Sequence, residues 1–260
     1  MNRLSQDLEN RVKVGFFSLT HSSPTGDDSP YLTWHQLDHM PEQYRLPGVV
    51  AGQRWASTPD NRQVRAVATE GWSSVQHVVC YLMGEPVDPT VDAFLSLGRE
   101  LAEVGRYPVA MPNQYRGALR LRQARAAPRV LVSDAVVPFR PHRGIYLVVE
   151  GARDGGSGDV GGVEEFGALG DLPDESMDAL LETPGVAGVW VYATSGDLRR
   201  SMFSPGDLRI TVCYLDDDPN TVAGRLGDLV GRLGHDGSRV QLAAPFESIV
   251  RWDWEHPGAT

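Results

Sequence analysis

The chain has few residues that could cross-link it or anchor it in a membrane. Its 260 residues include only two cysteines, Cys80 and Cys213, and it has no apolar run of the about 18 residues that a membrane-spanning helix needs. Its first residues, MNRLSQDLEN, lack the apolar stretch of a signal peptide. Two such cysteines are typical of small buried side chains in a reducing compartment. We therefore expect a cytoplasmic protein that does not associate with membranes.

Positive charge is also scarce. The sequence has 24 Lys and Arg against 34 Asp and Glu, which gives a formal net charge of −10. A protein that binds nucleic acid needs a basic surface to neutralise phosphates, so we expect no nucleic-acid partner. The apolar share of 41% is nevertheless enough for a buried core.

The second half of the chain repeats the first. Residues 79–82 (VCYL) recur unchanged at 212–215, and the Pro-Gly-Val of 47–49 recurs at 184–186. A period this long indicates two fused units rather than a solenoid, whose repeats have about 20 to 50 residues. The same spacing places Cys80 and Cys213 at equivalent positions of two strands. We expect a first repeat over residues 11–125, a linker over 126–142 and a second repeat over 143–257.

Each repeat reads as strand, helix, strand, strand, helix, strand. In the first repeat we expect strands at 12–20, 49–57, 75–82 and 115–122, and helices at 31–44 and 90–104. In the second we expect strands at 144–150, 186–194, 208–215 and 246–254, and helices at 174–182 and 221–233. This order is that of the ferredoxin-like βαββαβ unit, an antiparallel sheet with two helices on one face. Since the other face of each sheet needs cover, we expect an α+β fold in which the repeats pack sheet to sheet as a barrel.

One helix of the first repeat concentrates ionisable residues. On an ideal helix, His35, Asp38, His39 and Glu42 share one side. The opposite side carries Trp34, Leu37, Met40, Pro41 and Tyr44. We expect this apolar side to lie on the sheet, with Pro41 kinking or ending the helix.

The second repeat lacks this set of groups. At the repeat spacing, Leu172 replaces His35, and Ser176 replaces His39. Groups that one copy keeps and the other loses are better candidates for function than for folding. The site is therefore expected in the first repeat alone.

Two imidazoles beside two carboxylates can move protons near neutral pH. We interpret His39 as a general base or acid that Asp38 or Glu42 orients, with His35 as a second catalytic residue. Two alternatives stay open: a solvated helix face, and a divalent metal site on His35 and His39, whose ring nitrogens lie one helical turn apart. The sequence has no signature of a haem pocket, and we expect no cofactor.

Neighbouring strands supply candidate substrate contacts. Alternation puts His77 and Tyr81 on one face of their strand, and the apolar residues 78, 80 and 82 on the other. We expect the apolar face to meet the helices and the two polar side chains to point into the barrel. A structural role explains His77 equally well.

Three further residues complete the candidate substrate-binding set. Arg54 and Trp55 lie on the strand that follows the histidine helix, and His21 ends the first strand. Arg54 could bind an anionic or carbonyl oxygen, and a salt bridge at the barrel rim is the alternative use.

The motif Trp34-His35-x-x-Asp38-His39-Met40-Pro41-Glu42, followed by Leu46-Pro47-Gly48 and Gln53-Arg54-Trp55, resembles the EthD-like proteins of the dimeric α+β barrel superfamily. The motif covers residues 30–57, and the repeat extends the resemblance to nearly the whole chain. The resemblance implies an intrachain dimeric α+β barrel with a ligand cavity between sheet and helices, in which His39 is the best-matched residue. The superfamily includes cofactor-free monooxygenases, polyketide cyclases, muconolactone isomerases and haem enzymes, so no single reaction is implied.

The sequence thus predicts a small-molecule enzyme of the cyclase, isomerase or lyase type. Its substrate would be aromatic, polyketide-like or carbonyl-bearing. The alternatives are a cofactor-independent monooxygenase and a non-catalytic ligand-binding protein that could hold a metal ion. A homodimer is compatible with the sequence.

Overall fold

The computed structural model describes residues 9–107, 111–152, 169–198, 207–231, 233 and 238–249. Within them, antiparallel strands form one sheet in the order β2-β4-β1-β5-β7-β8-β6-β9, and β2 also pairs with β9, which closes a barrel. The strands are β1 (Val14–His21), β2 (Val49–Ala56), β3 (Val67–Ala68), β4 (Val75–Met83), β5 (Asn113–Ala126), β6 (Gly144–Ala152), β7 (Val186–Ala193), β8 (Leu208–Leu215) and β9 (Ser238–Ser248). The short β3 pairs with β9 beside β2.

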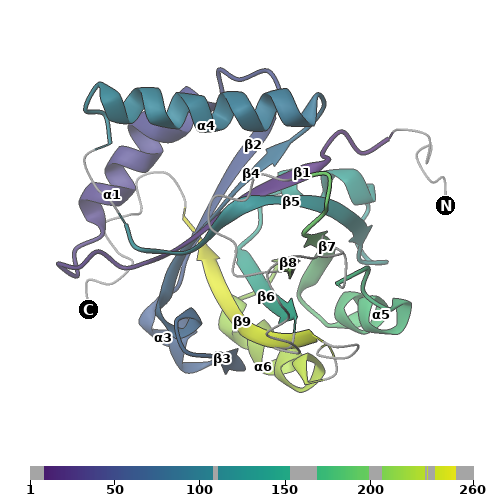
Figure 1. The fold of residues 1–260 in the computed structure, drawn as a ribbon. Helices are drawn as coiled ribbons and strands as arrows, with labels where there is room; N and C mark the ends of the chain where they lie inside the picture. Colours follow the sequence, from purple (N-terminus) through teal and green to yellow (C-terminus); the bar gives the residue numbers. More distant parts are fainter. Residues whose placement is uncertain are drawn as a thin grey trace, which may run out of the picture.

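Helices cover the outside of this barrel (Figure 1). They are α1 (Ser29–Trp34), the π-helical η1 (His35–His39), α2 (Met40–Gln43), α3 (Pro59–Gln63), α4 (Val87–Glu103), α5 (Asp174–Glu182) and α6 (Pro219–Val230), with short 3-10 turns η2 (Trp72–Ser74) and η3 (Asp134–Phe139). Helices α1 and α4 lie on the side of the first repeat, and α5 and α6 on the side of the second (Figure 1). The expected final strand at 246–254 instead begins at Ser238, and residues 250–254 lie outside the described residues.

The two repeats have the predicted ferredoxin-like strand order. The first half gives β2-β4-β1-β5 and the second gives β7-β8-β6-β9, joined by the β5–β7 and β2–β9 pairings. The predicted fold is therefore confirmed: two βαββαβ repeats form an intrachain dimeric α+β barrel. The two sheets face each other and are also hydrogen-bonded along both edges. The edge strands of each repeat therefore have pairing partners in the other repeat.

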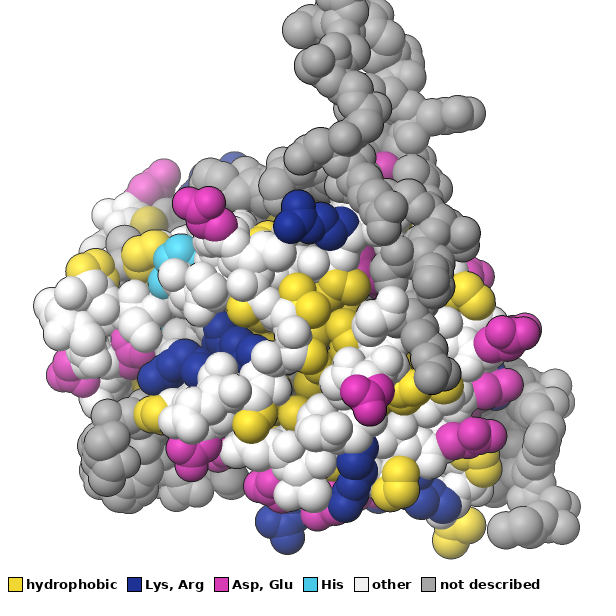
Figure 2. All heavy atoms as spheres, turned by 90° about the horizontal axis from the view of Figure 1, so that it is seen from below, with side chains coloured by type: hydrophobic (Ala, Val, Ile, Leu, Met, Phe, Trp, Pro, Cys, Tyr) yellow, Lys and Arg dark blue, Asp and Glu magenta, His cyan; other side chains and the backbone are white. Residues whose placement is uncertain are grey.

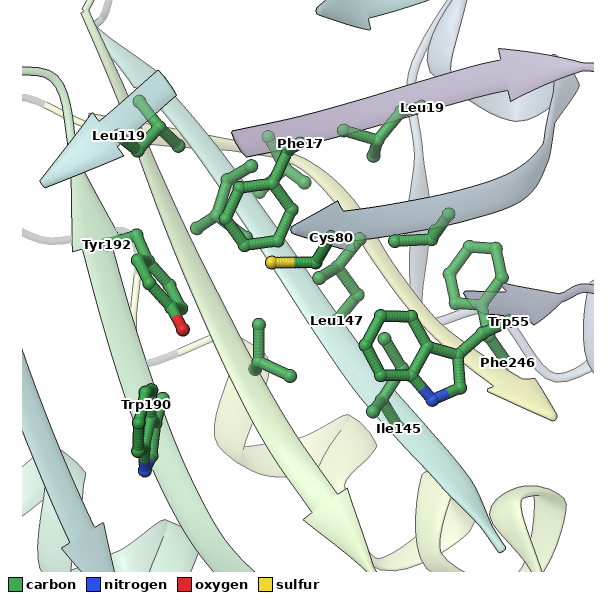
Figure 3. Close-up of a cluster of buried hydrophobic side chains, with 14 of the residues drawn as sticks. Phe17, Leu19, Trp55, Cys80, Leu119, Ile145, Leu147, Trp190, Tyr192 and Phe246 are labelled. Atoms are coloured by element: carbon green, nitrogen blue, oxygen red, sulfur yellow. The ribbon is translucent and has the colours of Figure 1, made fainter. Parts of the chain in front are cut away.

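Large apolar side chains from both repeats fill the barrel. Figure 3 shows them converging from strands of both halves. Phe17 and Tyr192, for example, meet edge to face with ring centroids 5.0 Å apart. The core also includes Leu19, Trp55, Cys80, Leu119, Ile145, Leu147, Trp190 and Phe246. The interior is therefore a packed core, and a ligand site must lie elsewhere.

The faces of β4 are opposite to those predicted. Val78, Cys80 and Leu82 belong to the barrel core, whereas Tyr81 packs on the helix side with Phe94 of α4. The barrel interior is enclosed by strands all round, so it takes the most apolar face of each strand. The partly covered outer face can accommodate polar groups beside a cavity.

The repeated VCYL segment also differs in orientation between the two halves. Cys80 lies in the barrel core, but Cys213 packs on the helix side in the second repeat. The strand registers show the same difference. Arg54 pairs with Val79, but Val191, which matches Arg54 in the repeat, pairs with Thr211 rather than with the residue that matches Val79. The expected equivalence of the two cysteines is therefore wrong, because a one-residue slip turns every side chain of a strand to its other face.

The surface in Figure 2 carries both signs of charge. Asp and Glu side chains are scattered around the rim of this face, and Lys and Arg side chains flank a central group of hydrophobic ones. The acidic excess is therefore not gathered into one patch on this face. No helix among the described residues is long and apolar enough to cross a membrane.

Candidate functional site

The histidine segment is not a regular α-helix. After α1 the chain makes a π turn, in which the Met40 N–H donates to the His35 carbonyl five residues back. Pro41 cannot donate to the carbonyl of Leu37, and its ring would crowd that oxygen in an α-helix. The wider turn just before Pro41 relieves this crowding, and the helix continues to Gln43 rather than ending at the proline.

This turn places the histidines on the inner side of the helix. His35 and His39 are only 5% and 4% exposed, whereas Leu37 is 50% exposed. Trp34 and Met40 are buried as predicted, but the prediction is wrong for Leu37 and for the histidine side, because the ideal α-helical projection does not apply across a π turn. π-helical segments of this kind are frequent at functional sites.

A cavity of about 310 Å³ lies between the histidine helix and the outer face of β1, β4 and β5. Its volume falls at the lower end of the range for small-molecule pockets, about 300 to 1,000 Å³. Most of its wall is aromatic or apolar. The lining residues are Phe16, Ser18, Thr20, Tyr31, Trp34, His35, His39, Val79, Tyr81, Phe94, Tyr107, Met111, Asn113 and Arg116.

His39 is held between two neighbours of its own helix. Its ring stacks on Trp34 with centroids 4.8 Å apart, and its Nε2 lies 3.4 Å from Gln43 Nε2. Burial, followed by the positive charge of Arg116, lowers the pKa of His39 to about 4. Its Nδ1 is buried and has no hydrogen-bond partner among the described residues. His39 is therefore a neutral imidazole with one free ring nitrogen.

His35 lies beside it, with ring centroids 5.5 Å apart. Its Nε2 is 3.4 Å from the Tyr81 hydroxyl, and its Nδ1 is also buried without a partner among the described residues. Burial and then the charge of Arg54 hold the pKa of His35 well below its usual range. The predicted catalytic pair is thus brought together on one cavity, and both rings are neutral near pH 7.

His77 lies behind the cavity wall. Its Nε2 is 2.8 Å from Asp28 Oδ2, and its ring contacts Tyr31 at 5.6 Å between centroids. Burial lowers the pKa of His77 to about 4, although the hydrogen bond to Asp28 acts in the opposite direction. Burial also acts to raise the pKa of Asp28, but hydrogen bonds from His77 and the Ser23 N–H outweigh it and lower that pKa. His77 therefore supports the wall rather than lining it.

The two carboxylates of the histidine helix are hydrogen-bonded to an arginine rather than to the histidines. Arg106, just beyond α4, donates two hydrogen bonds to Asp38, at 3.0 and 3.2 Å, and one to Glu42, at 3.0 Å. The expected orienting role of Asp38 and Glu42 therefore has no geometric support. Their outward position follows from the same π turn that directs the histidines inward.

The other residues predicted to bind substrate do not line the cavity. Arg54 is 5% exposed, and its guanidinium lies 4.5 Å from the centroid of the Tyr31 ring. It has no hydrogen-bond acceptor among the described residues, so the salt bridge considered for Arg54 is absent from that part of the chain. Trp55 is in the barrel core, where its Nε1 donates to His142 Nε2 at 3.0 Å, and the prediction that it contacts substrate is wrong. Strand alternation turns Trp55 away from the face that carries Arg54. His21 is not among the residues that line the cavity.

Sequence reasoning missed several residues that line the cavity or contact its histidines. Gln43, four residues after His39, could have been found as an i,i+4 partner of that histidine. Tyr107 and Arg116 could not, because both are distant in sequence from the histidine helix: Tyr107 lies just beyond α4, and Arg116 reaches the cavity through the pairing of β5 with β1. Arg116 also donates a hydrogen bond to the Tyr107 hydroxyl, while burial raises the pKa of that tyrosine.

The donors around the cavity do not form a metal cluster. Among the described residues, no group of three or more His, Cys, Asp or Glu side chains is arranged to hold a metal ion. In the described part of the chain His35 and His39 share the cavity without a third such ligand, and Asp38 and Glu42 are paired with Arg106.

No protein-family model and no curated protein matches the sequence. Among solved structures, similarity is found to an anthrone oxidase-like protein, with 9% identity, a TM-score of 0.47 and 93% of each chain covered. A candidate chlorite dismutase matches with 9% identity and a TM-score of 0.49, covering 92% of this chain and 95% of the other. A candidate monooxygenase from Fusobacterium nucleatum matches with 6% identity and a TM-score of 0.46, covering 94% of both chains. None of the three assigns an activity to this chain.

Proposed function

We propose that the cavity is the active site of a small-molecule enzyme that removes a proton from a carbon next to a carbonyl group. The observation that carries this proposal is the pair of buried histidines, His35 and His39, which line one cavity with their Nδ1 atoms unpartnered among the described residues. A buried polar atom without a partner costs about 1 to 3 kcal/mol. A substrate that contacts both atoms would recover that cost.

His39 is the general base in this proposal. Its Nε2 contacts the Gln43 side-chain amide, whose Oε1 is buried and unpartnered among the described residues. If the amide turns so that Oε1 accepts from Nε2–H, the Nδ1 lone pair is free to take the proton. The low pKa of His39, about 4, keeps the base unprotonated at neutral pH but makes it a weak base. It therefore suits an acidic C–H group, such as one activated by both a carbonyl and an aromatic ring.

Arg116 would stabilise the charge that forms. When the carbon loses its proton, negative charge moves to the carbonyl oxygen as an enolate. Arg116 is the charged side chain among the cavity-lining residues, and a fixed cation beside the developing charge stabilises such an oxyanion. The proton on His39 can then move to a different atom of the substrate. The net result is an isomerisation, or the first step of a cyclisation or elimination. The scheme requires no cofactor, because side chains supply both the base and the cation.

The test uses 2-tetralone, a flat ketone whose C1 hydrogens are next to both a carbonyl and a ring. Exchange of these hydrogens for deuterium in D₂O is followed by NMR with and without the protein. We expect the protein to accelerate exchange, and the His39→Gln variant to lose about 100-fold or more of that acceleration. Leu37→Gln, on the exposed side of the same helical segment, is the matched control and should retain it. Full acceleration in a folded His39→Gln protein would overturn the proposal.

The same samples separate the related activities. Oxygen consumption coupled to loss of 2-tetralone would indicate a cofactor-independent monooxygenase, in which the same base generates a carbanion that reacts with oxygen. Quenching of tryptophan fluorescence by 2-tetralone without any exchange would indicate a ligand-binding protein.

A further inference from the structure

Two arginines lie at the ends of one cross-strand row beneath the cavity. The strand registers pair Arg54 with Val79, Val79 with Ser18, and Ser18 with Arg116. These four residues, called here the arginine row, run across β2, β4, β1 and β5. Since neighbouring strands are about 4.8 Å apart, the two ends of the row lie about 14 Å apart at their Cα atoms. Three of the four residues line the cavity, and Arg54 lies behind Tyr31.

Neither arginine has a carboxylate partner among the described residues. The three side-chain nitrogens of Arg54 are buried and make no hydrogen bond there, and no ion pair is formed by Arg116 in that part of the chain. Asp38 and Glu42 are ion-paired with Arg106, and the Asp28 carboxylate is hydrogen-bonded to His77. The cavity thus has a positive charge that no carboxylate of the described residues pairs with, in a chain whose formal net charge is −10. Arg54 is buried and Arg116 is half-buried, and an unpaired charge withdrawn from water is costly unless a ligand of opposite charge compensates it.

The second repeat shows that the fold does not need these charges. Its row at the same registers is Val191, Thr211, Val148 and Ala243. The outer face there is filled directly by Met177, Leu180 and Leu181 of α5. The same architecture therefore packs with valine and alanine where the first repeat has arginines.

The shape of the cavity restricts the ligand further. Aromatic rings line its wall, and no Asp or Glu is among its lining residues. The rings are those of Phe16, Tyr31, Trp34, Tyr81, Phe94 and Tyr107. Flat aromatic rings pack well against such walls. A guanidinium group binds a planar carboxylate through paired N–H donors.

We propose that the ligand of this cavity is a small aromatic carboxylate whose acidic group binds two of the N–H donors of Arg116, with Arg54 as the second cation of the row. A guanidinium has five such donors, so others remain for the enolate oxygen of the proposed function. This inference names the substrate class of the active site and rests on the proposed function for what happens to that substrate. Binding itself can be measured without turnover.

The experiment compares 2-naphthoate with 2-naphthamide, a neutral molecule of nearly the same shape, by calorimetric titration. We expect naphthoate to bind at least tenfold more tightly than naphthamide. In Arg116→Ala, which introduces the residue of the second-repeat row, the preference should fall to within about twofold. The double variant Arg54→Val with Arg116→Ala should remove any remainder, and thermal melting verifies that each variant is folded. Arg45→Gln removes an exposed arginine that pairs with Glu42 outside the cavity, and it should leave the preference unchanged.

Equal binding of the two compounds, no binding of either at millimolar concentration, or an unchanged preference in the folded double variant would each overturn the inference. A failure of the acid–base proposal gives a different result. Selective naphthoate binding without 2-tetralone exchange would leave the anion site standing and remove the base. Exchange of 2-tetralone hydrogens without selective naphthoate binding would leave the base standing and remove the anion site.

Discussion

Replacing His39 by glutamine should make the protein less sensitive to acid. In the folded chain the pKa of His39 is about 4, lowered mainly by burial, whereas in the unfolded chain it is about 6.5. Between these values the unfolded chain binds a proton at this residue and the folded chain does not. Lowering the pH through this window therefore stabilises the unfolded state, and the native His39 makes folding less favourable there.

The size of the effect follows from the two pKa values. Each unit of pKa difference is worth about 1.4 kcal/mol, so His39 should lower the free energy of unfolding by about 2 kcal/mol between pH 7 and pH 5. The full loss, of about 3 kcal/mol, is reached below pH 4. His77, whose pKa is also lowered to about 4, acts in the same pH window, but it is present in both proteins and cancels in the difference between them. Asp28 acts at a lower pH, where carboxylates gain protons.

The assay is urea unfolding of the wild type and of His39→Gln at pH 7, 6 and 5. The difference in unfolding free energy between the two proteins should shift by about 2 kcal/mol in favour of the variant across this range. Leu37→Gln changes an exposed residue of the same segment without removing an imidazole, so its difference from the wild type should not vary with pH. A difference between His39→Gln and wild type that stays constant within about 0.5 kcal/mol would refute the buried, neutral state of His39.

Three further predictions concern the surroundings of the site. His35→Leu introduces the residue found at the repeat-equivalent position 172, so the variant should melt no lower than the wild type at pH 7, while 2-tetralone exchange slows at least tenfold. Arg106→Gln releases Asp38 and Glu42 at the surface and should lower the melting temperature slightly, with naphthoate affinity unchanged within about twofold. Trp55→Phe removes the hydrogen bond to His142 inside the barrel and should cost about 1 to 3 kcal/mol in urea unfolding, with no change in naphthoate binding because Trp55 is in the barrel core.

The fold could be predicted from the sequence because it depends on element order and on the internal repeat. Two βαββαβ units with exposed sheet faces have few ways to bury them, and the barrel is one. The faces of individual strands could not be predicted in the same way. Alternation in β4 showed that Val78, Cys80 and Leu82 share a face, but not whether that face meets helices or the barrel interior. The matched tetrapeptide was misleading for the same reason, since identity in sequence does not fix register.

The candidate site was predicted in part. The concentration of His35 and His39 on one helix was visible, and the structure places both on one cavity. Their inward direction depends on the π turn before Pro41, which an ideal helical projection cannot represent. Arg54 and Arg116 are far apart in sequence and share a row only through three strand pairings. No local pattern carries that information.

The central claim is that two neutral histidines and a cationic row form one ligand site. Nitrogen NMR of protein labelled with ¹⁵N-histidine tests it most directly, with His35→Leu and His39→Gln used to assign the signals. At pH 6, near the usual pKa of histidine, we predict neutral imidazole signals for both residues, and changes in both when 2-naphthoate is added. Imidazolium signals from the free protein at that pH, or signals that 2-naphthoate leaves unmoved, would contradict the account.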